Sequence, residues 1–132
     1  MIVVLDVSGA SQVIFHKEKM ERFDMVLQEA SLVIAPDLYV PELTNAIWKY
    51  GNFAGYTLEE CNSFIKIGLK YVNKFVDSRE LWLEAFRLGL ENRHSIYDMY
   101  YLALARQNEA MLVTNDKELL KIGKKLHVEY CY

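Results

Sequence analysis

The chain has little of what marks several large classes of protein. Its two cysteines, Cys61 and Cys131, lie far apart without a CxxC pair, so neither a disulfide framework nor zinc is indicated. Only two prolines occur, and no linker, repeat or low-complexity tract is visible. No run of about eighteen uncharged apolar residues exists, which excludes a transmembrane helix. The N-terminus lacks the basic start and long apolar stretch of a signal peptide, so we expect a cytoplasmic protein without a membrane partner.

The sequence also lacks a surplus of positive charge. Eighteen Asp and Glu residues against fifteen Lys and Arg give a formal charge of -3, which excludes the simplest kind of nucleic-acid binder. A nuclease stays possible, because an active site built from acids would produce the same deficit. The 132 residues have an apolar fraction of 52%, enough for a core without disulfides. We expect one domain over residues 1–132.

Short apolar runs alternate with segments of helical periodicity along the whole chain. Strands are predicted over residues 2–5, 32–35, 71–76, 110–114 and 128–131. Helices are predicted over residues 17–30, 41–50, 57–69, 81–90, 95–106 and 117–123. Ser8-Gly9, after the first strand, is typical of a turn. The alternation predicts an α/β fold, a three-layer α/β/α sandwich with a mainly parallel central sheet.

Four acids recur at equivalent places in this pattern. Asp6 directly follows the first strand and Asp116 separates a strand from a helix, whereas Glu42 and Asp98 lie in first turns of helices. Strand carboxyl ends and helix N-termini share one edge of a parallel sheet, so the four acids could converge there. Each also has a structural interpretation as a helix cap or as a complement to a helix dipole.

A cluster of carboxylates is stable only if a cation lies between its members, because the like charges otherwise drive them to take up protons. Mg²⁺ or Mn²⁺ is the natural cation for a site with oxygen ligands alone. Such ions activate water and stabilise the charge that develops on a phosphodiester, so phosphodiester hydrolysis is the reaction that fits best.

The ordered motifs around these acids resemble the PIN domain family. Val4-Leu5-Asp6-Val7-Ser8 is similar to its opening motif, and the segment from Pro41-Glu42 to Trp48 is similar to its second. The third match runs from Tyr97-Asp98 to Ala105, and Leu112-Val113-Thr114-Asn115-Asp116 resembles the fourth. Asp37 falls in the variable part of the second motif, and we interpret it as a turn or cap residue.

The resemblance covers nearly the whole chain and implies a small VapC-like toxin of a type II toxin–antitoxin pair. Such a protein would be a Mg²⁺-dependent (or Mn²⁺-dependent) endoribonuclease with an antitoxin partner, and we expect a homodimer. The four acids would hold the metal, supported by Ser8, Thr114 and Asn115. The alternatives are a non-catalytic PIN-like interaction module and a housekeeping RNA-processing nuclease.

Lysines at helical spacing follow the last of these acids. Lys117, Lys121 and Lys124 could hold the RNA backbone, although a solvated helix face gives the same pattern. Other folds with acids at strand ends fit less well. A receiver domain needs an acidic pair near the first strand, and a haloacid-type phosphatase needs a second Asp where Ser8 stands. A dinucleotide-binding domain needs more glycine than Ser8-Gly9-Ala10 offers.

Overall fold

The computed structural model describes all 132 residues and contains one parallel sheet. The strands are β1 (Ile2–Leu5), β2 (Leu32–Pro36), β3 (Lys74–Val76), β4 (Met111–Val113) and β5 (Tyr130–Cys131). Their order across the sheet is β3-β2-β1-β4-β5, and all four pairings are parallel. In the central strand, Val4 pairs with Ile34 on one side and with Leu112 on the other. The strands predicted from the apolar runs are thus present, although β3 is shorter than residues 71–76.

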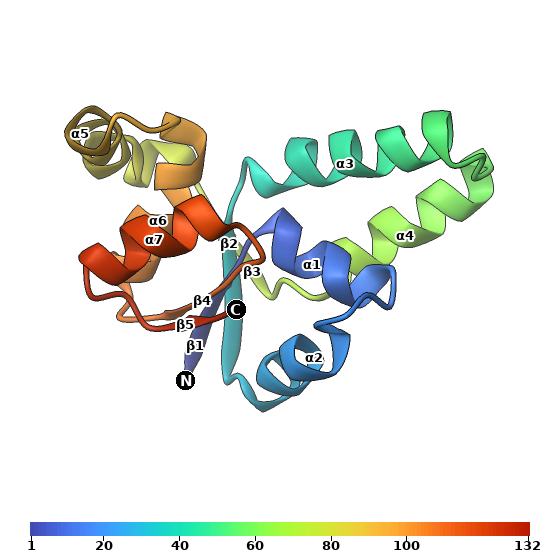
Figure 1. Ribbon diagram of the computed structural model, residues 1–132, viewed down its shortest axis with the longest axis horizontal. Coiled ribbons are helices and arrows are strands. Elements are labelled where there is room, and N and C mark those ends of the chain that lie inside the picture. The colour runs from blue at the N-terminus through green and yellow to red at the C-terminus, as the bar shows by residue number, and fades with distance from the viewer.

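Helices cover both faces of the sheet, which confirms the three-layer α/β/α prediction. They are α1 (Val7–Ile14), α2 (Met20–Glu29), α3 (Tyr39–Phe53), α4 (Leu58–Lys70), the 3₁₀ turn η1 (Ser78–Glu80), α5 (Trp82–Asn92), α6 (Ile96–Gln107) and α7 (Lys117–Lys125). Figure 1 shows α1 to α4 on the right of the strands, with α6 and α7 on the left. The helices α3 and α4 form a hairpin that projects away from the sheet (Figure 1).

Burial of apolar side chains between these layers stabilises the fold. Val3, Val4 and Leu5 of the central strand are fully buried. On one face, α6 packs directly against β1, β2 and β4. Its residues from Tyr101 to Ala105 are therefore buried without a break, which explains why this helix lacks a clear polar face. No helix in the protein combines the length and the apolar content required to cross a membrane.

The prediction of a turn at Ser8-Gly9 is wrong, because helix α1 begins at Val7 directly after the first strand. Asp6 caps this helix, and its Oδ1 accepts a hydrogen bond from the Gly9 N–H. A Cβ on Gly9 would lie 2.8 Å from the Val113 carbonyl oxygen. Glycine is therefore needed here for the close approach of α1 to β4, whereas the local pattern suggested a turn.

Other helix boundaries differ from the predictions by a few residues. Helix α3 begins at Tyr39, two residues before Pro41, and continues through Gly51 to Phe53. The cap at Asp77 starts η1, so that α5 begins only at Trp82. The sequence pattern does not resolve such short changes between 3₁₀ and α-helix.

Candidate functional site

The candidate site lies where the chain reverses its direction of winding across the sheet. From β1 the chain moves outward to β2 and β3, and it then crosses back to form β4 and β5 on the other side. In open α/β sheets, the crevice at the carboxyl ends of the two strands flanking such a point is the usual place for a ligand. Asp6 follows β1 at this point, and Thr114, Asn115 and Asp116 follow β4.

Asp6 is buried, with a relative exposure of 5%, inside a network of hydrogen bonds that joins these two strand ends. Its Oδ1 accepts bonds from the Gly9 N–H at 2.7 Å and from the Ser8 hydroxyl at 2.8 Å. The Thr114 hydroxyl donates to its Oδ2. The Asn115 N–H donates to Ser8 Oγ at 2.8 Å. The three residues expected to support the acids, Ser8, Thr114 and Asn115, thus lie in one network with Asp6.

Burial raises the pKa of Asp6 from 3.8 to about 7. The hydrogen bonds from Thr114, Gly9 and Ser8 act in the opposite direction, since they stabilise the carboxylate, and the negative charge of Asp116 adds to the rise. No Lys or Arg side chain forms an ion pair with Asp6. The carboxylate is thus desolvated without a compensating positive charge.

Glu42, in the first turn of α3, is held by a residue of α6. The buried Tyr101 hydroxyl donates a hydrogen bond to Glu42 Oε1 at 2.7 Å. Burial raises the pKa of Glu42, the bond from Tyr101 lowers it, and the charge of Asp98 raises it further. The sequence predicts Tyr101 as a core or interface residue, and it is buried, but its bond to Glu42 was not predicted, although Tyr101 follows Asp98 by three residues and so lies on the same side of α6.

Asp98 and Asp116 occupy the N-termini of α6 and α7. Burial is the main cause that raises the pKa of Asp98, and the charge of Asp116 adds to the rise. His94 lowers this pKa, and its Nδ1 lies 3.7 Å from Asp98 Oδ2. Asp116 caps α7, because its Oδ1 accepts bonds from the N–H groups of Glu118 and Leu119 at 2.9 and 3.2 Å. The capping role considered for Asp116 is thus present. Ser95, in contrast, makes no side-chain cap on α6.

The acids act on one another through their electric fields. The charge of Asp116 raises the pKa values of both Asp6 and Asp98, and that of Asp98 raises the pKa of Glu42. The contact between His94 and Asp98 is the only ion pair that involves any of the four. The four acids, from four separate elements, therefore form one connected cluster with an excess of negative charge.

The donor atoms of this cluster fit Mg²⁺ or Mn²⁺, because they are carboxylate oxygens with hydroxyl and carbonyl groups nearby. The side chains are not closed around a common point, and no three Asp, Glu, His or Cys residues are grouped closely enough to hold one ion. Both oxygens of Asp6 instead accept bonds from the protein. The arrangement brings the acids to one edge and leaves their side chains turned toward protein donors.

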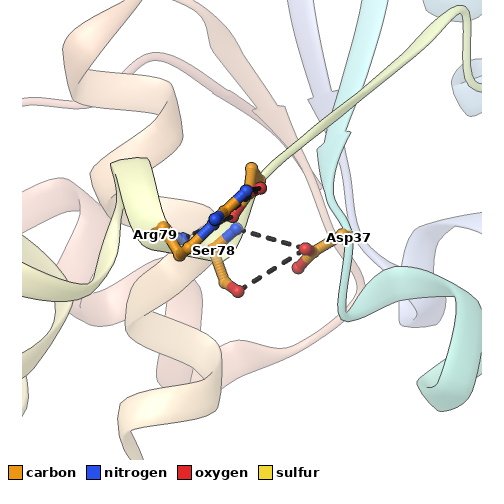
Figure 2. A network of polar contacts seen from close by, with 4 residues as sticks. Asp37, Ser78 and Arg79 are labelled. Atoms are coloured by element: carbon orange, nitrogen blue, oxygen red, sulfur yellow. Dashed lines mark hydrogen bonds and ion pairs between the residues drawn. The ribbon is translucent and has the colours of Figure 1, made fainter.

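Asp37 follows β2 at the same edge but binds a different segment. Figure 2 shows its carboxylate facing Ser78 at the start of η1. The Ser78 N–H donates to Asp37 Oδ2 at 3.2 Å, and the Ser78 hydroxyl lies 3.5 Å from the same oxygen. Arg79 is turned instead to Asp77, with Nη2 2.7 Å from Oδ2. Asp37 thus connects the end of β2 to the segment after β3.

The predicted lysines are spread along the exposed side of α7. Lys117 directly follows Asp116, and Lys121 lines a pocket of about 330 Å³ together with Arg93 and His94. Lys124 lies farther along the helix, with its Nζ 5.1 Å from the centre of the Tyr130 ring. Lys117 is therefore the one of the three that adjoins the acids in the chain.

Comparison with known proteins identifies the family of this chain. The family model for the PIN domain matches residues 3–125. A curated relative, Ribonuclease VapC3 of Pyrobaculum aerophilum, is 29% identical over an alignment of 126 residues, and the match covers 90% of this chain and 92% of the relative.

Two crystal structures share the fold. PAE2754 of Pyrobaculum aerophilum matches with a TM-score of 0.74 and 23% identity, over 92% of this chain and 79% of its own. VapBC2 of Rickettsia felis, bound to a DNA fragment from its promoter, matches with a TM-score of 0.72 and 17% identity, over 99% and 98%. Since the family model spans nearly the whole chain, the protein belongs to the PIN domain family.

Proposed function

We propose that the protein is a metal-dependent endoribonuclease that hydrolyses RNA phosphodiester bonds. The observation that carries the proposal is the cluster of Asp6, Glu42, Asp98 and Asp116, four mutually repelling acids without a Lys or Arg counter-charge. These residues would hold Mg²⁺ or Mn²⁺. When bound there, the ion supplies Lewis acidity that activates water and stabilises charge on the phosphodiester.

The other residues of the site prepare the acids for this task. Tyr101 fixes the orientation of Glu42, and Ser8 and Thr114 fix that of Asp6. Asn115 holds Ser8 in turn through its backbone N–H. These bonds fix the ligand oxygens before the substrate arrives, which reduces the cost of ordering them during the reaction.

The biological role that we propose is that of the toxin in a toxin–antitoxin pair. It is supported by the relative named Ribonuclease VapC3 and by the fold shared with the protein in the VapBC2 complex. A cognate antitoxin and a second copy of the chain are the proposed protein partners. Trp48 and Leu58 support a protein interface, because these apolar side chains of the α3–α4 hairpin are 56% and 78% exposed.

Cleavage of a defined single-stranded RNA tests the enzymatic proposal. We expect cleavage by the parent protein with Mg²⁺ or Mn²⁺, none in EDTA, and none by folded Asp6→Asn or Asp98→Asn proteins. A matched Asp24→Asn variant, altered on α2 away from the cluster, should cleave as the parent does. No cleavage by the parent with any divalent metal would refute the proposal and favour the non-catalytic interaction module.

The toxin role is tested separately in cells. Expression of the parent should arrest growth, and co-expression of the protein encoded by the adjacent gene should relieve the arrest and co-purify with the chain. Cleavage without growth arrest or a co-purifying partner would favour a housekeeping nuclease instead.

A further inference from the structure

A pocket of about 540 Å³ opens beside the acid cluster, between α1 and α3. Ser8 and Asn115, which belong to the hydrogen-bond network of Asp6, form one end of its lining. Lys17 and Lys49 also line it. The pocket is therefore continuous with the candidate site.

The α3 wall of the pocket is a helix face that starts at Glu42. On α3, Ala46, Lys49 and Phe53 follow Glu42 by four, seven and eleven residues, so all four lie on one side of the helix. At 1.5 Å per residue, Lys49 lies about 10 Å from Glu42 along the axis. A chain bound across the acids and running along α3 would enter this pocket next.

The charge of the pocket is opposite to that of the acid cluster. Its ten lining residues include two lysines and no Asp or Glu. Neither Lys17 nor Lys49 forms an ion pair with a carboxylate. Two ammonium groups without a carboxylate partner, next to a group of acids, suit a ligand that carries a phosphate beyond the one at the metal.

Aromatic rings give the pocket a rigid wall and an exposed rim. Tyr50 stacks on Phe15 with ring centres 3.9 Å apart, and the Lys17 ammonium donates to the Tyr50 hydroxyl at 2.6 Å. Phe53, at the rim, is 81% exposed. Exposed aromatic rings beside cations are the usual surface on which single-stranded bases stack.

We propose that this pocket binds the nucleotide of single-stranded RNA that adjoins the cleaved phosphodiester. Lys17 and Lys49 contact its phosphate and Phe53 stacks on its base. This inference rests on the proposed function for its biological meaning, but the binding it describes can be measured without cleavage. It places the main backbone contacts on Lys17, in the loop between α1 and α2, and on Lys49 of α3 rather than on the lysines of α7.

The test is equilibrium binding of a fluorescent single-stranded RNA of about ten nucleotides, in EDTA, over a range of salt concentrations. For single strands, each lost phosphate contact reduces the salt slope by about 0.7 and weakens binding about fivefold at 0.1 M salt. We expect both changes for Lys17→Gln and for Lys49→Gln, with near-parent binding for Lys17→Arg and Lys49→Arg. Lys66→Gln, an exposed lysine of α4, is the matched control and should bind as the parent does.

Further variants separate the nucleotide from simple charge attraction. Phe53→Ala should weaken RNA binding about fivefold or more without changing the salt slope, since it removes stacking alone. With Mg²⁺ present, Lys49→Gln should raise KM and leave kcat unchanged.

Two results would overturn the inference. Parent-like binding by the Lys17 and Lys49 variants together with weak binding by Lys117→Gln would move the RNA path to α7. Equal competition by polyglutamate, with no effect of Phe53→Ala, would mean that the pocket recognises only negative charge. Failure of the parent to cleave RNA would refute the proposed function, whereas the binding measured in EDTA would still decide the role of the pocket.

Discussion

Asp6 should make the metal-free protein less stable as pH rises. Its pKa is raised from 3.8 to about 7 in the folded protein, mainly by burial. Between these two values the folded state binds a proton that the unfolded state has lost, so the free energy of unfolding falls with increasing pH. At 1.36 kcal/mol per unit, the total loss is about 4 kcal/mol, complete just above pH 7.

The assay is urea denaturation in EDTA at several pH values, with Asp6→Asn as the reference. Asparagine preserves the shape of the side chain and has no charge, and Thr114 can accept from its amide. Of the total loss, about 2.5 kcal/mol falls between pH 5 and pH 8. The variant should therefore gain about that much stability relative to the parent over this interval.

The raised pKa values of Glu42 and Asp98 change the free energy of unfolding in the same way in the parent and in the variant. The difference between the two proteins therefore reports on Asp6. Adding Mg²⁺ at pH 8 should stabilise the parent and leave Asp6→Asn unchanged, since an ion that binds only the folded state stabilises it by mass action. A difference between the two proteins that does not vary with pH would refute the reasoning about Asp6.

Three further substitutions test individual contacts. Tyr101→Phe removes the hydrogen-bond donor to Glu42, so the pKa of Glu42 should rise. The acid limb of the pH–rate profile should then move to higher pH, and kcat should fall. An unchanged profile would exclude a positioning role for Tyr101. Thr114→Val removes a donor to Asp6 and an acceptor for the Asp116 N–H, and should cost about 1–3 kcal/mol in urea denaturation at pH 8, whereas Thr114→Ser should recover most of it. Gly9→Ala places a Cβ 2.8 Å from the Val113 carbonyl oxygen and should destabilise by about 1–3 kcal/mol, whereas the control Gly123→Ala, with its nearest neighbour at 3.4 Å, should be neutral or stabilising; equal effects would contradict the packing argument.

The sheet and the places of Asp6 and Asp116 at its edge were predictable from the sequence because they depend on local patterns. Runs such as Ile2–Leu5 are buried on both sides, as their continuous apolar character indicates. Parallel pairing then brings the ends of β1 and β4 together, with Asp6 and Asp116 after them. The order of elements alone is sufficient for this result.

The rest depends on contacts between distant segments, which local patterns do not contain. Helix α1 was missed because Gly9, typical of a turn, is there to let the helix approach β4. Tyr101 has the periodicity of a core residue, and its role depends on Glu42, 59 positions away. Lys17 and Lys49 lie in unrelated segments and meet only in the folded pocket.

The central claim is that the acid cluster binds the divalent cation needed for RNA cleavage. Titration with Mn²⁺, followed by electron paramagnetic resonance of the free ion, tests it most directly. We expect the parent to bind Mn²⁺ and Mg²⁺ to displace it, and we expect Asp6→Asn and Asp98→Asn to lose the binding while Asp24→Asn retains it. Parent-like Mn²⁺ binding by both cluster variants, or no binding by the parent at millimolar Mn²⁺, would show that the cluster is not the metal site.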